Sequence, residues 1–342
     1  MLLISFGTRP EWIKIKPVID EIEGSIPFKI LFTGQHTSLI DKSIEDYEYI
    51  KLCVDDSLGG TRLDSIVCSV LNNMSILDDV DAVMVQGDTT SAFSVALGAF
   101  HRNIPVIHLE AGLRTFDKQN PYPEEFNRCS ISAMADLHLC PTFSSAHNIM
   151  RSNNSKRGVH VVGNTVLDNL VDYTVESEDF VLVTMHRREN HENIKEWFEE
   201  INRISVSSPH LEFILPIHPN PNVRRYDYLL TDVTVIEPLA YSDCIDMVSR
   251  CKFLITDSGG LQEESSFFGK RCIVCRKVSE RTEGGGDFAL LCPLPEDLED
   301  VYQDVMEVCE INPIVTLPCP YGDGKSSEKI HKILEDLQCL KK

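Results

Sequence analysis

The sequence predicts an α/β protein that contains two doubly wound parallel sheets. Short apolar runs alternate with helical patterns along the 342 residues, and repeated βα units of this kind form parallel sheets. Most of the apolar runs do not alternate with polar residues, as is typical of strands covered on both faces. A chain of this length corresponds to about two domains.

The apolar runs give the expected strands in chain order. They are Leu2–Phe6, Phe28–Thr33, Ala82–Gln86, Val106–Glu110, Leu137–Cys140, Val159–Val162, Phe180–Thr184, Leu211–Pro216, Val233–Ile236, Phe253–Thr256 and Arg271–Cys275. Helical patterns lie between them: Ile15, Val18, Ile19 and Ile22 keep the spacing of one buried helix face. We expect about seven strands before residue 165 and four or five after it.

The domain boundary is expected near Gly163–Asp172, where an apolar run gives way to a polar stretch. Residues 1–168 would then form an N-terminal Rossmann-like domain, and residues 169–325 a C-terminal Rossmann-like domain. Residues 326–342 are expected to form a helix that packs back on the N-terminal domain. Two such sheets side by side would bind a ligand in the cleft between them, at the carboxyl ends of the strands.

Composition excludes several classes of partner. Asp and Glu number 53 against 32 Lys and Arg, so the formal charge is −21. A chain this acidic is a poor ligand for nucleic acid. No window approaches 18 consecutive apolar residues, so no membrane span is expected, and the first residues are typical of a β-strand rather than a signal peptide. The twelve cysteines are expected to be free thiols in a reducing cytoplasm.

Polar clusters follow the expected strands of the first half. Gly7-Thr-Arg-Pro-Glu comes after the first strand, and it places Arg9 and Lys14 near a helix start that favours anions. Gly87-Asp-Thr-Thr-Ser follows the Ala82–Gln86 run, and Asp88 lies at its turn. The carboxyl ends of parallel strands share one edge of a sheet, so these clusters are expected to be neighbours.

Two further acidic positions belong to the same group. Glu110 ends the strand at Val106, and Arg114 is the cation expected to pair with it. Pro121-Tyr-Pro-Glu-Glu-Phe-Asn-Arg follows and contains Glu124 and Arg128. Asp88, Glu110 and Glu124 are therefore expected to converge, and carboxylates that approach one another raise each other's pKa into the range needed for proton transfer.

The second half supplies groups suited to binding an anion. Met185-His-Arg-Arg-Glu-Asn places His186 and Arg187 after an apolar strand, and His218 follows the next strand. A Ser258-Gly259-Gly260 turn then opens a helix, so backbone amides and the helix dipole would face a phosphate.

Two more residues complete this predicted nucleotide or phosphate site. Glu264 is one turn into the helix that follows the Ser-Gly-Gly turn, where a carboxylate would accept hydrogen bonds from ribose hydroxyls. Arg281, after the next strand, adds a cation near the same edge. The sequence contains no GxxxxGK[ST], no GxGxxG after a strand and no GxSxG, which disfavours ATP hydrolysis, nicotinamide chemistry and serine-ester hydrolysis.

Taken together, these clusters resemble the non-hydrolysing UDP-N-acetylglucosamine 2-epimerase family. The matching stretches occur in order over nearly the whole chain: GTRPEWIKIKPVI, TGQH, QGDTTSAF, HLEAGLRT, PYPEEFNR, VGNTVLD, MHRREN, IHPNP, TDSGGLQEES, ERTEGG and, in altered form, CPYGDGK. The combination of HLEAGLRT, PEEFNR, HRREN and DSGGLQEE is highly specific.

The resemblance implies a fold like that of GT-B glycosyltransferases, with UDP held between two domains. It also implies interconversion of UDP-GlcNAc and UDP-ManNAc, through loss of the C2 proton and of UDP to give 2-acetamidoglucal, followed by re-addition. No metal and no other cofactor is implied. A homodimer in the cytoplasm that serves polysaccharide precursor synthesis is expected.

The family also implies a role for each matching residue. Asp88, Glu110 and Glu124 would be the acid and base groups, and His186 would support departure of the diphosphate. The remaining residues would contact the substrate: Arg9, Lys14, Arg114, Arg128, Arg187, His218, Ser258, Gly259, Gly260, Glu264 and Arg281.

The chain departs from the family pattern at a few positions. Gln86 stands where His usually precedes GDT, and Thr282 stands where Pro often follows the Glu-Arg pair. Thr37 and Ser38 follow TGQH, where many bacterial members have Arg and a further polar residue of a regulatory UDP-GlcNAc site. We therefore expect allosteric activation by substrate to be weakened or lost.

Other functions stay open at this point. A hydrolysing relative would release free ManNAc and UDP, and a modified UDP-linked N-acetylhexosamine could replace UDP-GlcNAc. A GT-B glycosyltransferase would need an acceptor and would not exchange the C2 proton with solvent. A nucleotide-sugar sensor without catalysis is the alternative that is not an enzyme.

Overall fold

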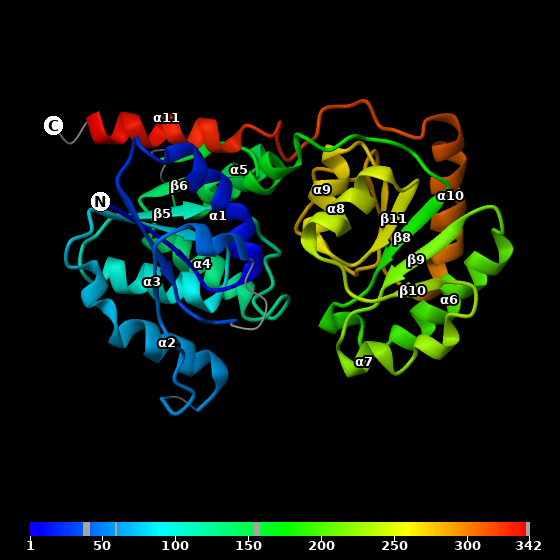
Figure 1. The fold of residues 1–342 in the computed structure, drawn as a ribbon, viewed down its shortest axis with the longest axis horizontal. Helices are drawn as coiled ribbons and strands as arrows, with labels where there is room; N and C mark the ends of the chain where they lie inside the picture. The colour runs from blue at the N-terminus through cyan, green and yellow to red at the C-terminus, as the bar shows by residue number, and fades with distance from the viewer. Residues whose placement is uncertain (37–41, 59, 154–157, 340–342) are drawn as a thin grey trace. The chain divides into compact units, whose positions relative to one another are not determined.

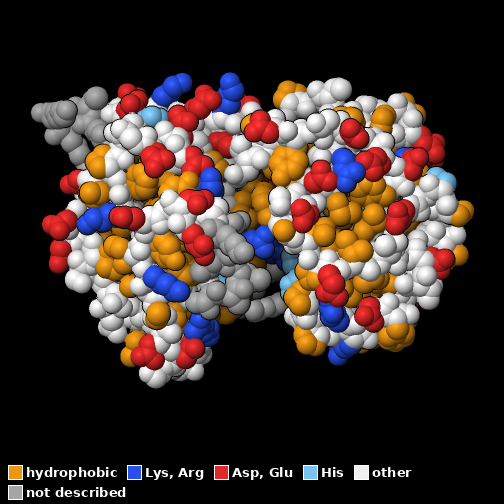
Figure 2. Space-filling view, viewed as in Figure 1, with side chains coloured by type: hydrophobic (Ala, Val, Ile, Leu, Met, Phe, Trp, Pro, Cys, Tyr) orange, Lys and Arg blue, Asp and Glu red, His pale blue; other side chains and the backbone are white. Residues whose placement is uncertain are grey.

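The computed structural model describes residues 1–36, 42–58, 60–153 and 158–339, and they form two compact α/β units. Unit 1 consists of residues 1–169 together with 324–342, and unit 2 of residues 170–323 (Figure 1). Within the described residues no helix is long and apolar enough to cross a membrane. On the face drawn in Figure 2, acidic side chains are spread over the surface, in keeping with the net charge.

Unit 1 is a parallel sheet with helices on both faces. Its described strands run in the order β3-β2-β1-β4-β5-β6-β7, and every neighbouring pair is parallel. The strands are β1 (Leu2–Phe6), β2 (Phe28–Phe32), β3 (Tyr49–Lys51), β4 (Ala82–Gln86), β5 (Val106–Leu109), β6 (Leu137–Cys140) and β7 (Val159–Val161). The helices are α1 (Arg9–Ile22), α2 (Arg62–Asn72), α3 (Thr90–Phe100), α4 (Glu124–Met134), α5 (Phe143–Asn153) and α11 (Ser326–Cys339).

Alternate residues of the central strand feed two separate cores of unit 1. Leu2, Ile4 and Phe6 of β1 pack with apolar residues of α1 and α11. Leu3, on the opposite face of the strand, packs with the apolar faces of α2 and α3. This arrangement explains why the strand is apolar at successive positions, since both of its faces are covered.

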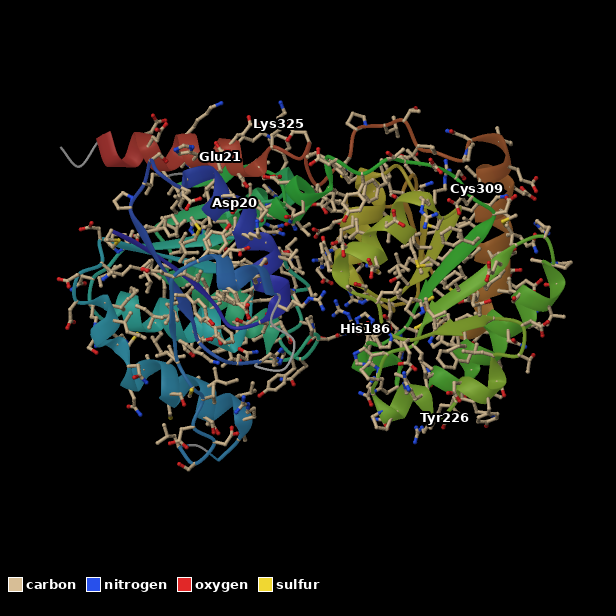
Figure 3. The ribbon with its side chains drawn as sticks, viewed as in Figure 1. Asp20, Glu21, His186, Tyr226, Cys309 and Lys325 are labelled. Carbon is tan, nitrogen blue, oxygen red and sulfur yellow. The ribbon has the colours of Figure 1, made fainter. Side chains whose placement is uncertain are left out.

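The C-terminal helix α11 lies beside α1 (Figure 1). Asp168 accepts hydrogen bonds from the Ser326 and Ser327 amides at 3.0 and 2.7 Å, so its carboxylate satisfies N–H groups that have no partner within the helix at the start of α11. At the end of α1, Glu21 (labelled in Figure 3) contacts Nδ1 of His331 at 3.2 Å. These contacts attach the end of the chain to the domain in which it begins.

Unit 2 repeats the same plan with a smaller sheet. The order of its described strands is β10-β9-β8-β11-β12-β13, again all parallel. The strands are β8 (Phe180–Thr184), β9 (Glu212–Pro216), β10 (Thr234–Ile236), β11 (Phe253–Thr256), β12 (Cys272–Val274) and β13 (Ala289–Leu291). The helices are α6 (Ile194–Ser207), α7 (Pro221–Arg224), α8 (Tyr241–Arg250), α9 (Gly259–Phe267) and α10 (Leu298–Ile311).

The predicted fold class, two parallel α/β sheets, is confirmed, but the strand list needs correction. Two edge strands, β3 and β13, were absent from the prediction, and the second sheet has six strands instead of four or five. Both missed strands are three residues long and partly exposed, and β3 (Tyr49–Lys51) also lacks a continuous apolar run. The predicted strand at Val106–Glu110 ends one residue earlier, because Glu110 adopts a left-handed backbone with φ 62°.

Candidate functional site

The loop that follows β4 presents Asp88 at the carboxyl edge of the unit 1 sheet. Gly87, with φ 66°, makes the turn, and Thr89 caps α3 by accepting a hydrogen bond from the Ala92 amide at 3.0 Å. Arg128 of α4 holds the Asp88 carboxylate from the other side, with Nη2 and Nε at 2.6 and 2.8 Å from Oδ2. Arg128, expected to contact substrate, thus also anchors Asp88.

Glu110 follows the neighbouring strand β5, and donors surround its carboxylate. Lys14 Nζ lies 2.7 Å from Oε1 and 2.6 Å from Oε2, and the Gln86 amide donates to Oε2. Asn164 Nδ2 approaches Oε1 at 3.4 Å. Lys14 and the two amides therefore hold the Glu110 carboxylate in place at the carboxyl edge of the unit 1 sheet.

The expected pairing of Glu110 with Arg114 is wrong. The buried Arg114 guanidinium donates to the Leu113 carbonyl at 2.8 Å and to Ser132 Oγ at 2.7 Å. Lys14, which is distant in sequence, lies beside Glu110 instead. Lys14 belongs to α1, which follows β1, and only β4 separates β1 from β5, the strand that Glu110 follows. Arg114 therefore joins its own loop to α4 instead of neutralising the catalytic candidate.

Glu124 is the first residue of α4 and is half-buried. It lies one helical turn before Arg128, so the two side chains share a face of the helix, and Arg128 contacts Asp88. A Cβ atom on Gly87 would lie 3.6 Å from Glu110 Oε2, which brings the Asp88 loop close to Glu110. Asp88 and Glu110 therefore lie near each other at one edge of the unit 1 sheet, and Glu124 begins the helix whose Arg128 holds Asp88.

Glu11 is a fourth carboxyl group at this edge, and it was not among the predicted site residues. It is buried and accepts hydrogen bonds from the Gly7 amide at 3.0 Å, Thr8 Oγ1 at 2.7 Å and Thr89 Oγ1 at 2.8 Å. Burial, with a smaller contribution from Asp88, raises the pKa of Glu11 to about 7. The Thr8-x-x-Glu11 spacing of a capping box was the signal that would have identified it.

Arg9, also predicted, begins α1 beside Glu11 and is half-buried. It makes no hydrogen bond or ion pair with another residue that the structure describes. Thr37 and Ser38, on which the expected loss of regulation depends, lie outside the described residues.

In unit 2, a buried carboxylate organises the loop that follows β8. Asp257 accepts hydrogen bonds from the backbone amides of His186 (2.9 Å) and Arg187 (2.8 Å) and from Asn190 Nδ2 (3.0 Å). It is fully buried. Since Asp257 also precedes the Ser258-Gly-Gly turn, it ties the His186 loop to the start of α9.

His186, labelled in Figure 3, is partly exposed at this loop, with 39% of its side chain accessible. Its Nδ1 lies 3.4 Å from Asp257 Oδ1, and its ring stacks on His218 with centroids 5.6 Å apart. Burial lowers the pKa of His218, so His218 presents a neutral ring to His186. The stack and the carboxylate together fix the orientation of the His186 imidazole.

Two guanidinium groups flank the N-terminus of α9. Ser258 caps this helix by accepting from the Leu261 amide at 3.5 Å. A Cβ atom on Gly259 would lie 2.6 Å from Arg281 Nη1 and 3.2 Å from Arg187 Nη2. Backbone amides of the first turn of α9, the helix dipole and two cations converge here, which is the arrangement that binds phosphate.

Arg281 is itself held by buried carboxylates. Its Nε lies 2.6 Å from Glu263 Oε1, and its Nη1 contacts Glu280. Glu280 also contacts the buried Arg276 at 3.0 Å. The guanidinium expected to contact nucleotide is therefore fixed in place by an ion-pair network.

Glu264, the predicted ribose ligand, lies in α9 below the Gly259-Gly260 turn. Tyr241 of α8 donates a hydrogen bond from its hydroxyl to Glu264 Oε1 at 2.7 Å.

Within the described part of the chain, no group of three or more His, Cys, Asp or Glu side chains is arranged to hold a metal ion.

Comparison with known proteins gives matches over almost the whole chain. The model of the family described as UDP-N-acetylglucosamine 2-epimerase matches residues 20–335. The UDP-N-acetylglucosamine 2-epimerase of Campylobacter jejuni is 34% identical over 374 residues, covering 97% of each chain. That of Bacillus subtilis is 34% identical, covering 95% of this chain and 92% of the relative.

Solved structures agree with these sequence matches. The UDP-GlcNAc 2-epimerase of Neisseria meningitidis, crystallised with UDP-GlcNAc, superposes with a TM-score of 0.88 at 32% identity, covering 98% of this chain and 99% of the other. The Methanocaldococcus jannaschii UDP-GlcNAc 2-epimerase, in complex with UDP-GlcNAc and UDP, gives 0.80 at 28% identity, with coverage of 98% and 99%.

Proposed function

Since the chain belongs to the UDP-N-acetylglucosamine 2-epimerase family, we propose that it interconverts UDP-GlcNAc and UDP-ManNAc. The observation that carries the proposal is the set of carboxyl groups at the unit 1 edge, in which Glu110 is contacted by Lys14 and Asp88 by Arg128. Inversion at C2 requires removal of a proton from one face of the sugar and its return on the other, for which paired carboxyl groups are suited.

The proposed reaction proceeds by elimination and re-addition. A carboxylate removes the proton from C2, the electrons of that bond form a C1–C2 double bond, and UDP departs with the electron pair of the C1–O bond. The intermediates are 2-acetamidoglucal and UDP. A carboxylic acid then returns a proton to the opposite face of C2 while a diphosphate oxygen re-forms the bond to C1.

We assign the sugar to unit 1. Asp88, Glu110 and Glu124 are the acid and base candidates, and the donors around Glu110 hold its carboxylate in one position. Arg9 and Lys14 bind the diphosphate and sugar, with Lys14 exchanging part of its contact with Glu110 for the substrate. Arg114 stabilises this edge by its hydrogen bond to Ser132 of α4, and Arg128 of α4 does so by its ion pair with Asp88.

We assign the nucleotide to unit 2. Ser258, Gly259 and Gly260 bind phosphate at the start of α9, where Arg187 and Arg281 add positive charge. Charge that develops on the departing diphosphate is stabilised there. His186, oriented by Asp257 and His218, supports departure of UDP, and Glu264 accepts hydrogen bonds from the ribose.

The enzyme is further proposed to act in the cytoplasm as a homodimer, in the synthesis of polysaccharide precursors. The cysteines support a cytoplasmic location, since those that the structure describes are free thiols and disulfides form in oxidising compartments.

Incubation with UDP-GlcNAc in D₂O tests the reaction, the substrate and hydrolysis in one proton NMR experiment. We expect UDP-ManNAc to accumulate, with deuterium at C2 of both nucleotide sugars. Accumulation of free ManNAc with UDP would instead indicate the hydrolysing reaction. Recovery of UDP-GlcNAc without deuterium at C2 would contradict epimerisation of this sugar, and the same experiment with other UDP-linked N-acetylhexosamines would then test a modified substrate.

A further inference from the structure

Tyr241 is not among the assigned site residues, but it makes a hydrogen bond to one of them, Glu264. It is the first residue of α8, and its hydroxyl donates to Glu264 Oε1 at 2.7 Å. Burial, together with the adjacent carboxylate, raises the pKa of the Tyr241 hydroxyl far above its ordinary value. The phenol therefore keeps its proton at every pH at which the protein works and remains a donor.

The contact fixes how the Glu264 carboxylate is turned. Glu264 is buried, and the oxygen that Tyr241 does not contact, Oε2, lies 3.9 Å from the position of a Cβ atom on Gly260. Oε2 therefore faces the first turn of α9, on the side where the Ser258-Gly-Gly turn presents its amides. The terminal torsion of a glutamate side chain is broad, and the hydrogen bond from the Tyr241 hydroxyl restrains it.

We propose that Tyr241 is a positioning residue that locks the Glu264 carboxylate toward the sugar of a bound nucleotide, and thereby makes the site prefer ribonucleotides over 2′-deoxyribonucleotides. The inference rests on the proposed function, since it takes Glu264 to be the ribose ligand. A ribose diol presents two O–H donors, and a carboxylate held in one orientation accepts from them at little cost in side-chain entropy.

The discrimination has a simple physical origin. A buried carboxylate that loses the donor it was oriented to receive leaves an acceptor unsatisfied, and sites of this kind reject the analogue that lacks the hydroxyl. A carboxylate free to rotate can turn to other donors, and the penalty for the missing hydroxyl then shrinks. Tyr241 therefore acts on the ratio of affinities more than on the affinity for UDP itself.

The test is isothermal titration of UDP and 2′-deoxy-UDP into wild type and Tyr241→Phe. We expect wild type to bind UDP about tenfold more tightly than 2′-deoxy-UDP, which is the effect of one hydrogen bond to a charged group, and we expect Tyr241→Phe to reduce this ratio to about twofold. Turnover at saturating UDP-GlcNAc should change little while KM rises, because the acid and base groups belong to unit 1.

The matched control is Tyr302→Phe, which removes another buried hydroxyl of unit 2, the one that bonds Ser208 Oγ at 2.7 Å. It should leave the ratio unchanged. Glu264→Gln, which keeps the side chain's shape, should also reduce the ratio and so guards against a folding defect in the Tyr241 variant.

The outcomes separate the two proposals. An unchanged ratio in Tyr241→Phe, with a reduced ratio in Glu264→Gln, would overturn the role of Tyr241 and leave the proposed function intact. Equal affinity of wild type for both nucleotides would also overturn the inference. Failure of wild type to bind UDP at all would count against the proposed function and against this inference with it.

Discussion

The two sheets end in edges of different chemistry, although they are built on the same plan. At the unit 1 edge, acidic side chains follow the strands, and Lys14 and Arg128 hold two of them. At the unit 2 edge, Arg187 and Arg281 flank the open N-terminus of α9. One edge is suited to moving protons and the other to holding an anion, which is why we propose bond chemistry for unit 1 and nucleotide binding for unit 2.

The largest expected effect is in unit 1. Glu110→Gln keeps the size of the side chain but removes its capacity to accept a proton, and turnover should fall about 10²- to 10⁴-fold. Affinity for UDP, measured by calorimetry, should stay within about twofold of wild type, because most of the groups proposed to bind UDP belong to unit 2. Substitution of the exposed Glu45 by Gln is the control. Near-normal turnover in Glu110→Gln would contradict the assignment of proton transfer to the unit 1 edge.

Gly259→Ala tests the opposite edge. The added methyl group would lie 2.6 Å from Arg281 Nη1 and 3.2 Å from Arg187 Nη2, so it must displace the Arg281 guanidinium, which ion pairs hold in place. We expect the Kd for UDP to rise about tenfold, with a smaller change in turnover at saturation. Gly60→Ala, where the nearest atom would lie 3.7 Å away, should change neither quantity. A loss of turnover with unchanged UDP affinity would contradict this assignment.

Unit 1 also contains a buried histidine whose titration should affect stability. His108 donates from Nε2 to the Gly87 carbonyl at 2.8 Å, and burial lowers its pKa to about 3. Below pH 6.5 this histidine binds a proton in the unfolded chain but stays neutral in the folded chain. The free energy of unfolding therefore falls as pH drops from 6.5 toward 3.

His108→Gln places an amide donor near the position of Nε2 and removes the titration. The free energy of unfolding, measured by calorimetry, should then fall by roughly 3 kcal/mol less than that of wild type as pH drops from 7 to 4. The exposed His160→Gln variant is the control. An equally steep pH dependence in His108→Gln and wild type would show that His108 does not stay neutral in the folded protein.

Glu11 should give a smaller effect of opposite sign. Its folded pKa of about 7 lies above the ordinary value of 4.5, so the folded chain keeps a proton that the unfolded chain has lost between these values. The contribution of Glu11 to stability therefore falls as pH rises from 4.5 to 7. The free energy of unfolding of Glu11→Gln, measured with urea, should therefore rise by roughly 2 kcal/mol relative to that of wild type over this interval. A constant difference between the two would contradict the raised pKa, and the exposed Glu48→Gln serves as reference.

The sequence was most informative where one local pattern decided the structure. Apolar runs identified the buried strands, and a Ser-Gly-Gly turn between β11 and α9 identified the helix start that Arg187 and Arg281 flank. The short edge strand β3 carried no such pattern, because an edge strand with exposed residues needs no continuous apolar run. The edge strand β13 is apolar but only three residues long.

Pairings over long distances in the chain were not predictable in the same way. Arg114, four residues after Glu110, was the expected partner, but the order of strands in the sheet brings Lys14 to that position. The role of Asp257 in holding His186 depends likewise on the adjacency of β8 and β11. Such contacts are set by topology, which a motif does not encode.

The return of the chain to unit 1 makes unit 2 an insertion within the first domain. A fragment that stops at residue 169 would lack Ile330 and Leu334, which fill the core beside α1, and would leave that apolar surface in water. An isolated first domain therefore has to be made as residues 1–169 joined to 324–339 by a short linker, whereas the second domain can be excised as one uninterrupted piece.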